Sequence, residues 1–167
     1  LNNLGSERAL AGQPEAALEA YQRSARLART SNDARALAQA EANAARAALQ
    51  MTDTAAAQTA LGRAHAALTE AAKKGRITAA EAAELRIHLA RSEVELARQA
   101  PDQRRAALLR AHQDLSEASQ SAEASGDARA ASYALGSLGE LYAAEGGRDA
   151  EALFLTRRAL KAAEDAR

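Results

Sequence analysis

The sequence predicts an all-α protein built from about four antiparallel helix pairs. Three observations support this prediction. Alanine, the residue with the highest helix propensity, dominates a chain of 167 residues in which only 2% are aromatic. Short turn signals containing Gly, Pro or Asn-Asp divide the chain into segments of helical length. Four segments repeat one arrangement of large and small residues at intervals of 40 to 49 residues, which is typical of a solenoid of helix pairs.

The first repeat is expected over residues 1–30, and its first helix is truncated at the start. Leu4 and Gly5 lie on one face of that helix. Gly12 ends it, and Pro14 suits the first turn of the second helix. Because the chain begins without Met, apparently inside a helix, we expect it to be a piece of a longer protein.

The second repeat is expected over residues 33–74. Asp33 and Asp53 are suitable N-caps, because their carboxylates can accept hydrogen bonds from the free N–H groups of a first helical turn. Gly75 ends the second helix of this repeat. The side chains expected to point inward are Ala44, Ala45, Ala48, Ala57, Leu61, Ala64 and Leu68.

The third repeat is expected over residues 78–125. Thr78 and Glu81 have the T-x-x-E spacing of a capping box, which predicts the start of its first helix. The first helix carries the large apolar residues Leu85, Leu89, Val94 and Leu96, and a second helix, which starts at Pro101 and Asp102, carries Leu108, Leu109 and Leu115.

The fourth repeat, residues 127–166, has the clearest pattern, and Asp127 opens it. Its first helix carries Leu135, Leu138, Gly139 and Tyr142 on one face. Gly146 and Gly147 can take the left-handed conformation that ends this helix and reverses the chain. Gly139 is expected to face the small residues of the second helix, which are Ala152, Thr156 and Ala159, so that the two backbones can approach closely.

A run of three apolar residues, Leu153, Phe154 and Leu155, follows on that second helix. One helix face cannot bury three consecutive side chains. We expect a following repeat to cover the run, and the alternative is that it forms a contact surface.

Charge and composition limit the kinds of function that the chain can have. The 22 basic and 22 acidic residues are not segregated, which argues against a nucleic-acid partner. No apolar run reaches the ~18 residues of a membrane span, so no membrane partner is expected. Cysteine is absent, and His65, His88 and His112 lie in separate predicted helices. We therefore expect no catalytic, cofactor-binding or metal-binding residue, and no enzyme. The cytoplasm is the expected compartment, with the periplasm left open.

The repeated pattern resembles the tetratricopeptide repeat (TPR), W-x2-L-G-x2-Y followed by A-x3-F. The last repeat matches it as Leu135-x2-Leu138-Gly139-x2-Tyr142, then Ala152-x3-Thr156-x2-Ala159. The first matches as Leu1-x2-Leu4-Gly5, then Ala17-x3-Tyr21-x2-Ser24, and the two middle repeats match less well. The resemblance implies a right-handed α-solenoid, a TPR-like superhelix, that forms a single domain over residues 1–167. The repeats are longer than the family's usual length of about 34 residues.

The long repeats, together with the segments ASYALGSLGELY and LTRRAL, resemble the TPR arrays that precede CHAT domains in bacteria. CHAT domains are caspase-like proteases. The resemblance implies a scaffold that binds a protein or peptide in a concave groove, such as the regulatory arm of a CHAT-type protease. Two alternatives stay open. One is an architectural protein that self-associates through the ends of its solenoid, and the other is the effector-sensing arm of a transcription regulator.

In TPR arrays the first helix of each pair lines the groove, so the resemblance also implies which residues contact a partner. They are polar side chains at matching positions of the successive first helices: Asn2, Ser6, Gln39, Asn43, Arg46, Gln50, Glu84, His88, Arg91, Glu95 and Glu140. The alternative is that these are solvated outer residues of amphipathic helices. Arg46 and Arg91 can pair with an acidic ligand. The favoured alternative is that they pair with Glu41, Glu95 or another exposed acid.

Overall fold

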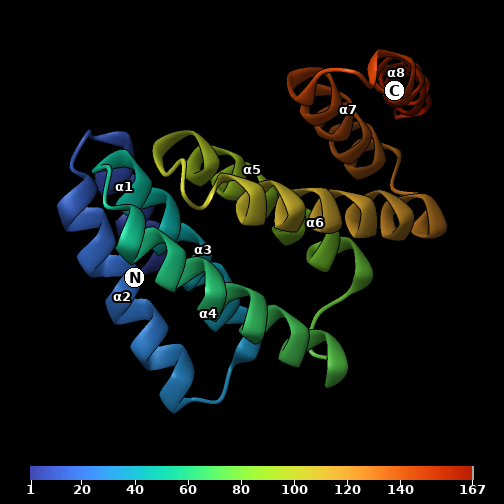
Figure 1. Cartoon of the computed structure of the whole chain (residues 1–167). Coiled ribbons are helices and arrows are strands. Elements are labelled where there is room, and N and C mark those ends of the chain that lie inside the picture. The colour runs from blue at the N-terminus through green and yellow to red at the C-terminus, as the bar shows by residue number, and fades with distance from the viewer. Residues whose placement is uncertain (167) are drawn as a thin grey trace. The chain divides into compact units, whose positions relative to one another are not determined.

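Eight α-helices account for most of residues 1–166, the part of the chain that this computed structural model describes (Figure 1). In chain order they are α1 (Asn2–Leu10), α2 (Pro14–Thr30), α3 (Ala34–Gln50), α4 (Thr54–Lys73), α5 (Ala79–Gln99), α6 (Arg104–Ser125), α7 (Ala128–Glu145) and α8 (Asp149–Asp165).

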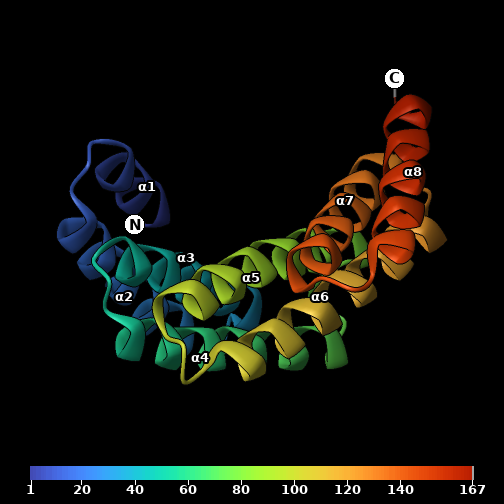
Figure 2. The same cartoon turned by 45° about the horizontal axis from the view of Figure 1, so that its top comes forward.

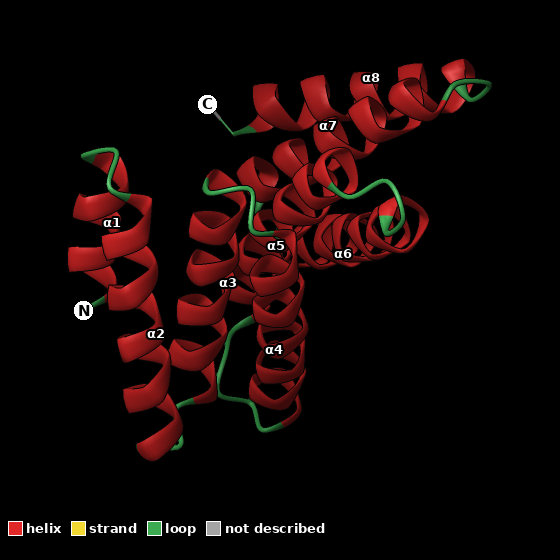
Figure 3. Ribbon diagram, turned by 60° about the vertical axis from the view of Figure 1, so that its left-hand side comes forward, coloured by secondary structure: helices red, strands yellow, loops and turns green. Residues whose placement is uncertain are grey.

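The chain divides into two compact units. Unit 1 comprises Leu1–Ile77 and Arg91–Leu108, and unit 2 comprises Thr78–Ala90 and the chain from Leu109 onward. Within unit 1, α1 packs on α2, α2 on α3, and α3 on α4. Within unit 2, α7 packs side by side with α8 (Figure 2). The described residues hold no strand (Figure 3), and helices that are neighbours in the sequence pack together, so the prediction of an all-α repeat architecture is confirmed.

Local hydrogen bonds begin the helices at the expected residues. The side chains of Asp33, Asp53 and Asp127 each accept a hydrogen bond from the backbone N–H three residues on, at 2.9, 3.0 and 3.0 Å. The Thr78 N–H donates to the Glu81 carboxylate at 2.9 Å, and the Glu81 N–H donates to the Thr78 hydroxyl at 3.2 Å. These reciprocal bonds form the predicted capping box.

The turn between α7 and α8 and the close packing of these helices also agree with the prediction. Gly146 and Gly147 have φ values of 73° and 72°, in the left-handed region that favours glycine. A Cβ atom added to Gly139 would lie 3.0 Å from Thr156 Oγ1 and 3.2 Å from the Ala152 carbonyl oxygen. Both contacts are tight, so a side chain at this position would push α7 and α8 slightly apart.

Alanine and leucine form most of the buried interior. The largest fully buried side chains are Tyr21, Leu61, Leu68, Leu89, Glu93, Leu96, Leu115 and Leu135. Leu109 is an exception among the leucines, because it is 68% exposed. Ala107 and Ala111, two positions to either side of it, carry the buried face of α6, so Leu109 lies on the opposite face.

Candidate functional site

α3 meets solvent along one narrow row of side chains. From Ala38 to its end, every residue of α3 is buried except Gln39, Asn43, Arg46 and Gln50. These four follow one another at steps of three and four residues, so they share one face of the helix. We name this row the α3 stripe. Three of its members carry a carboxamide and the fourth carries a guanidinium group.

The residues of α5 are divided between the two units, and each part of the helix exposes polar side chains. In unit 1 it exposes Arg91 and Arg98 and half-buries Glu95, and we name these three residues the α5 stripe. In unit 2 the same helix exposes Glu84 and His88. The Glu84 carboxylate and His88 Nε2 lie 4.0 Å apart.

α7 in unit 2 exposes Arg129, Tyr133 and Glu140. The Tyr133 side chain is 51% exposed, and the Arg129 guanidinium carbon lies 6.0 Å from the centre of its ring. Sequence reasoning missed Arg98, Arg129 and Tyr133. The signal that finds them is the same step of three or four residues, continued along each helix from the predicted positions.

The two predicted residues on α1 are partly used within their own helix pair. The Tyr21 hydroxyl donates to Ser6 Oγ at 3.2 Å, which joins α2 to α1. Asn2 is half-buried, and among the described residues its Oδ1 atom is buried without a hydrogen-bond partner. Ser6 therefore takes part in the packing of α1 on α2.

The predicted residues fall into two groups. Unit 1 contains Asn2, Ser6, Gln39, Asn43, Arg46, Gln50, Arg91 and Glu95, whereas unit 2 contains Glu84, His88 and Glu140. Within unit 1, Gln99 brings the ends of α3 and α5 together. Its Nε2 atom donates to Glu95 at 2.9 Å and to the Leu49 carbonyl, beside Gln50, at 3.1 Å. The α3 and α5 stripes therefore end close to each other.

The expected pairing of Arg46 with Glu41 is wrong, because Glu41 is not an exposed acid. Its side chain is 4% exposed, and it binds Arg29 Nη2 at 3.2 Å and Arg63 Nε at 3.1 Å. These two arginines come from α2 and α4, on either side of α3. Arg46 itself is exposed. Glu95 pairs with Arg98 Nη1 at 2.8 Å.

The histidines lie apart, as the sequence indicates. His65 Nε2 is 3.3 Å from the fully buried carboxylate of Glu93, and His112 Nε2 is 2.6 Å from the Tyr142 hydroxyl. Over residues 1–166, no three His, Cys, Asp or Glu side chains gather closely enough to hold a metal ion. None of the helices in that range combines the length and hydrophobicity needed to cross a bilayer.

A scan against protein-family models finds no match to this chain, and a search of curated proteins finds no significant relative. The resemblance to TPR arrays therefore depends on the quoted residues alone.

Proposed function

We propose that this chain is a non-enzymatic helical-repeat module that binds an extended peptide of a partner protein along the α3 and α5 stripes. One observation carries the proposal. From Ala38 onward α3 is enclosed on its other sides, and the single row that it leaves in water there consists of Gln39, Asn43, Arg46 and Gln50. This row is rich in groups that both donate and accept hydrogen bonds.

The chemistry of a carboxamide matches that of a peptide backbone. Each backbone residue offers one N–H donor and one C=O acceptor, and each Gln or Asn side chain offers the complementary pair. Steps of three and four residues separate the members of the row by about 4.5–6 Å along the helix axis. Two residues of an extended peptide span about 6.5 Å. Gln39 and Asn43, which are about 6 Å apart along the axis, can therefore contact successive same-facing peptide groups, whatever the peptide sequence.

The arginines add a preference for acidic side chains. The two stripes hold Arg46, Arg91 and Arg98 against one acid, Glu95, which already pairs with Arg98. A guanidinium group binds a carboxylate through two parallel hydrogen bonds. We therefore expect the bound peptide to carry at least one Asp or Glu side chain near Arg46.

The resemblance to TPR arrays supports the same proposal, since that family binds proteins through its first helices. It also suggests the first partner to test, which is a caspase-like protease domain of the CHAT type. Under this proposal the chain regulates or recruits such a domain and performs no chemistry itself.

A capture experiment from lysate of the source cell tests the proposal. The bait is the whole chain, either wild type or with Arg46→Glu and Arg91→Glu. The matched control carries the same charge change away from the stripes, Arg26→Glu and Arg105→Glu, at two exposed arginines. We expect a partner that the wild type and the control both retain and that the stripe variant loses, detected by mass spectrometry.

Retention of every partner by the stripe variant would contradict the proposal. Capture of nothing by the wild type, together with self-association that increases with concentration in light scattering, would favour the architectural alternative. A second variant tests the carboxamides without changing the charge. The substitutions Gln39→Ala, Asn43→Ala and Gln50→Ala together should weaken binding of the captured partner about tenfold or more, because each removes hydrogen bonds of about 0.5–1.5 kcal/mol.

A further inference from the structure

A buried carboxylate between two arginines forms a positive cluster on the side of α3 that faces away from the α3 stripe. Glu41 comes two positions after Gln39, and two residues turn a helix by about 200°, so Glu41 points away from the stripe. It binds Arg29 of α2 through Oε1 and Arg63 of α4 through Oε2. We name these three residues the arginine cluster. Two guanidinium groups against one carboxylate leave one positive charge in excess.

Both guanidinium groups of the arginine cluster keep the capacity to bind a second anion. Each uses one nitrogen for Glu41, which is Nη2 of Arg29 and Nε of Arg63. A guanidinium group has five N–H donors on three nitrogens, and the two side chains are 54% and 50% exposed. Because Glu41 already holds both groups in place, a ligand that binds them loses less affinity to the ordering of side chains.

The packing at this position of the repeat does not require two arginines. Arg86 follows Glu41 by 45 residues, which is one of the intervals at which the segments repeat. In unit 2, Arg86 Nη2 lies 2.7 Å from the Glu117 carboxylate, and Arg86 Nη1 lies 3.8 Å from that of Asp114. One cation there faces two acids, which is the reverse of the arginine cluster. The positive excess is therefore particular to unit 1.

A cavity of about 350 Å³ adjoins the arginine cluster, and we name it the unit 1 cavity. Residues of α2, α3 and α4 line it. Four alanines and Leu18 give it a largely apolar wall, Gln22 and Thr59 add hydrogen-bonding groups, and Arg63 and Asp53 carry its charges. Its volume lies within the range of about 300–1,000 Å³ that is typical of sites for small molecules.

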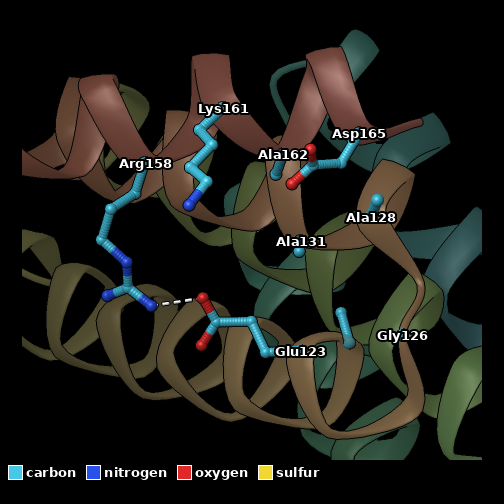
Figure 4. A pocket seen from close by; sticks show the side chains of 9 residues that line it. Glu123, Gly126, Ala128, Ala131, Arg158, Lys161, Ala162 and Asp165 are labelled. Atoms are coloured by element: carbon cyan, nitrogen blue, oxygen red, sulfur yellow. Dashed lines mark hydrogen bonds and ion pairs between the residues drawn. The ribbon is translucent and has the colours of Figure 1, made fainter. Parts of the chain in front are cut away.

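A cavity in unit 2 shows the other way in which an arginine can be placed. This cavity has a volume of about 510 Å³ and lies between α8, the end of α6 and the start of α7 (Figure 4). Arg158 extends across it and pairs with Glu123, which lines the same cavity (Figure 4). Arg63 of the unit 1 cavity is instead held by the buried Glu41 of α3. Its charge is therefore not matched by an acid that reaches across the open space.

The charges around the unit 1 cavity are balanced but lie at opposite ends. Asp53 and Arg63 are ten residues apart, which is about 15 Å along the axis of α4. Asp53 accepts one hydrogen bond from the Ala56 N–H, and a carboxylate has about four acceptor positions. Together with Arg29 and Glu41 the charges sum to zero. The cavity therefore complements a ligand without net charge that has a carboxylate at one end and an ammonium group at the other.

We propose that the unit 1 cavity binds a free dipeptide or tripeptide, with the ligand's carboxylate on Arg29 and Arg63 and its ammonium group at Asp53. An extended peptide advances about 3.3 Å per residue, so two or three residues span about 7–10 Å. The side chains of Asp53 and Arg63 both reach into the cavity and shorten the remaining distance. Small apolar side chains of the ligand lie against the alanines and Leu18. The proposal does not depend on the α3 stripe, which lies on the opposite side of α3.

Isothermal titration calorimetry of the whole chain with trialanine tests the proposal. One matched probe is trialanine with an acetylated amino end, which removes the ammonium group, and the other has an amidated carboxyl end, which removes the carboxylate. We expect trialanine to bind and each blocked peptide to bind about fivefold more weakly or less, because each has lost one charge-assisted contact. Equal binding of all three peptides would overturn the proposal, and so would the absence of trialanine binding.

Two variants assign the ends of the ligand. Asp53→Asn removes the charge but keeps the N-cap, because asparagine caps a helix as well as aspartate does. It should weaken trialanine binding and abolish the effect of acetylation. Arg63→Gln leaves a hydrogen-bond donor for Glu41 and should abolish the effect of amidation. If the two variants still distinguish the blocked peptides as the wild type does, the proposal is wrong.

Two controls should bind trialanine as the wild type does. Asp127→Asn makes the same change at an N-cap of unit 2. The variant with Arg46→Glu and Arg91→Glu changes the stripes and leaves the unit 1 cavity intact. Loss of trialanine binding in that variant would place the ligand on the stripes and contradict the proposed site.

Discussion

α3 in unit 1 and α8 in unit 2 are both alanine-rich helices of 17 residues, yet they meet solvent in different ways. α3 packs between α2 and α4, and ten of its residues are buried. In α8 only Ala152 and Ala159 are buried. An enclosed helix keeps one polar row in water. A helix covered on one side keeps a broad face, which on α8 includes the large apolar side chains of Leu153, Phe154 and Leu160.

The largest effect is expected where α8 packs against α7. Gly139→Leu would place a side chain against the Ala152 carbonyl and the Thr156 side chain, and the α8 backbone cannot yield as a flexible side chain can. We expect the free energy of unfolding to fall by about 2–3 kcal/mol, measured by urea denaturation. Leu160→Ala on the open side of the same helix should change it by less than about 0.5 kcal/mol. Equal losses from the two variants would show that α8 has no open side.

A smaller effect is expected on α3, where a buried side chain and a stripe residue lie close in sequence. Glu41→Ala removes the carboxylate that Arg29 and Arg63 share. Because both arginines are half-exposed and regain water, we expect a loss of about 1–2 kcal/mol in the free energy of unfolding. Asn43→Ala on the α3 stripe serves as the control, with a change below about 0.5 kcal/mol. If the control loses as much stability as Glu41→Ala, the stripe is part of the core and not a binding surface.

The smallest effect is expected at an exposed ion pair. Lys74 Nζ lies 2.6 Å from Glu70 Oε1, and this hydrogen bond, together with the charge of Lys74, lowers the pKa of Glu70 from its ordinary value of 4.5. A lowered pKa stabilises the fold above the unfolded value, and the contribution is lost as the pH falls through the folded value. Glu70→Gln should therefore lower Tm slightly at pH 7 and leave it unchanged at an acidic pH below the folded pKa. A difference in Tm that is the same at both pH values would contradict the ion pair as its cause.

Helix starts could be predicted from the sequence because their causes are local. Asp33, Asp53 and Asp127 bind backbone groups three residues away, and the Thr78 capping box closes within the same turn. The exposed rows of the first helices could be placed for a similar reason. Once the register of a repeat is known, helical geometry determines which positions share a face.

What could not be predicted depends on residues far apart in the sequence. Glutamate is usually a surface residue. Glu41 can be buried because it pairs with Arg29 and Arg63, which lie 12 and 22 positions away in the sequence. Glu93 is fully buried beside His65, which is 28 positions away. Leucine is usually a core residue, but Leu109 lies on the uncovered face of α6. Hydrophobicity indicates which side chains prefer burial, whereas the neighbouring helices decide which ones obtain it.

The pair of arginines around Glu41 has a consequence for how such a chain can grow. Arg29 belongs to the first helix pair, while Glu41 and Arg63 belong to the second. A segment copied from residue 33 to residue 74 and inserted elsewhere would bring Arg63 with it but leave Arg29 behind. Its carboxylate would then need a new arginine from whichever helix preceded it. The piece that can be duplicated or transplanted intact is therefore a helix pair together with the last turn of the helix before it.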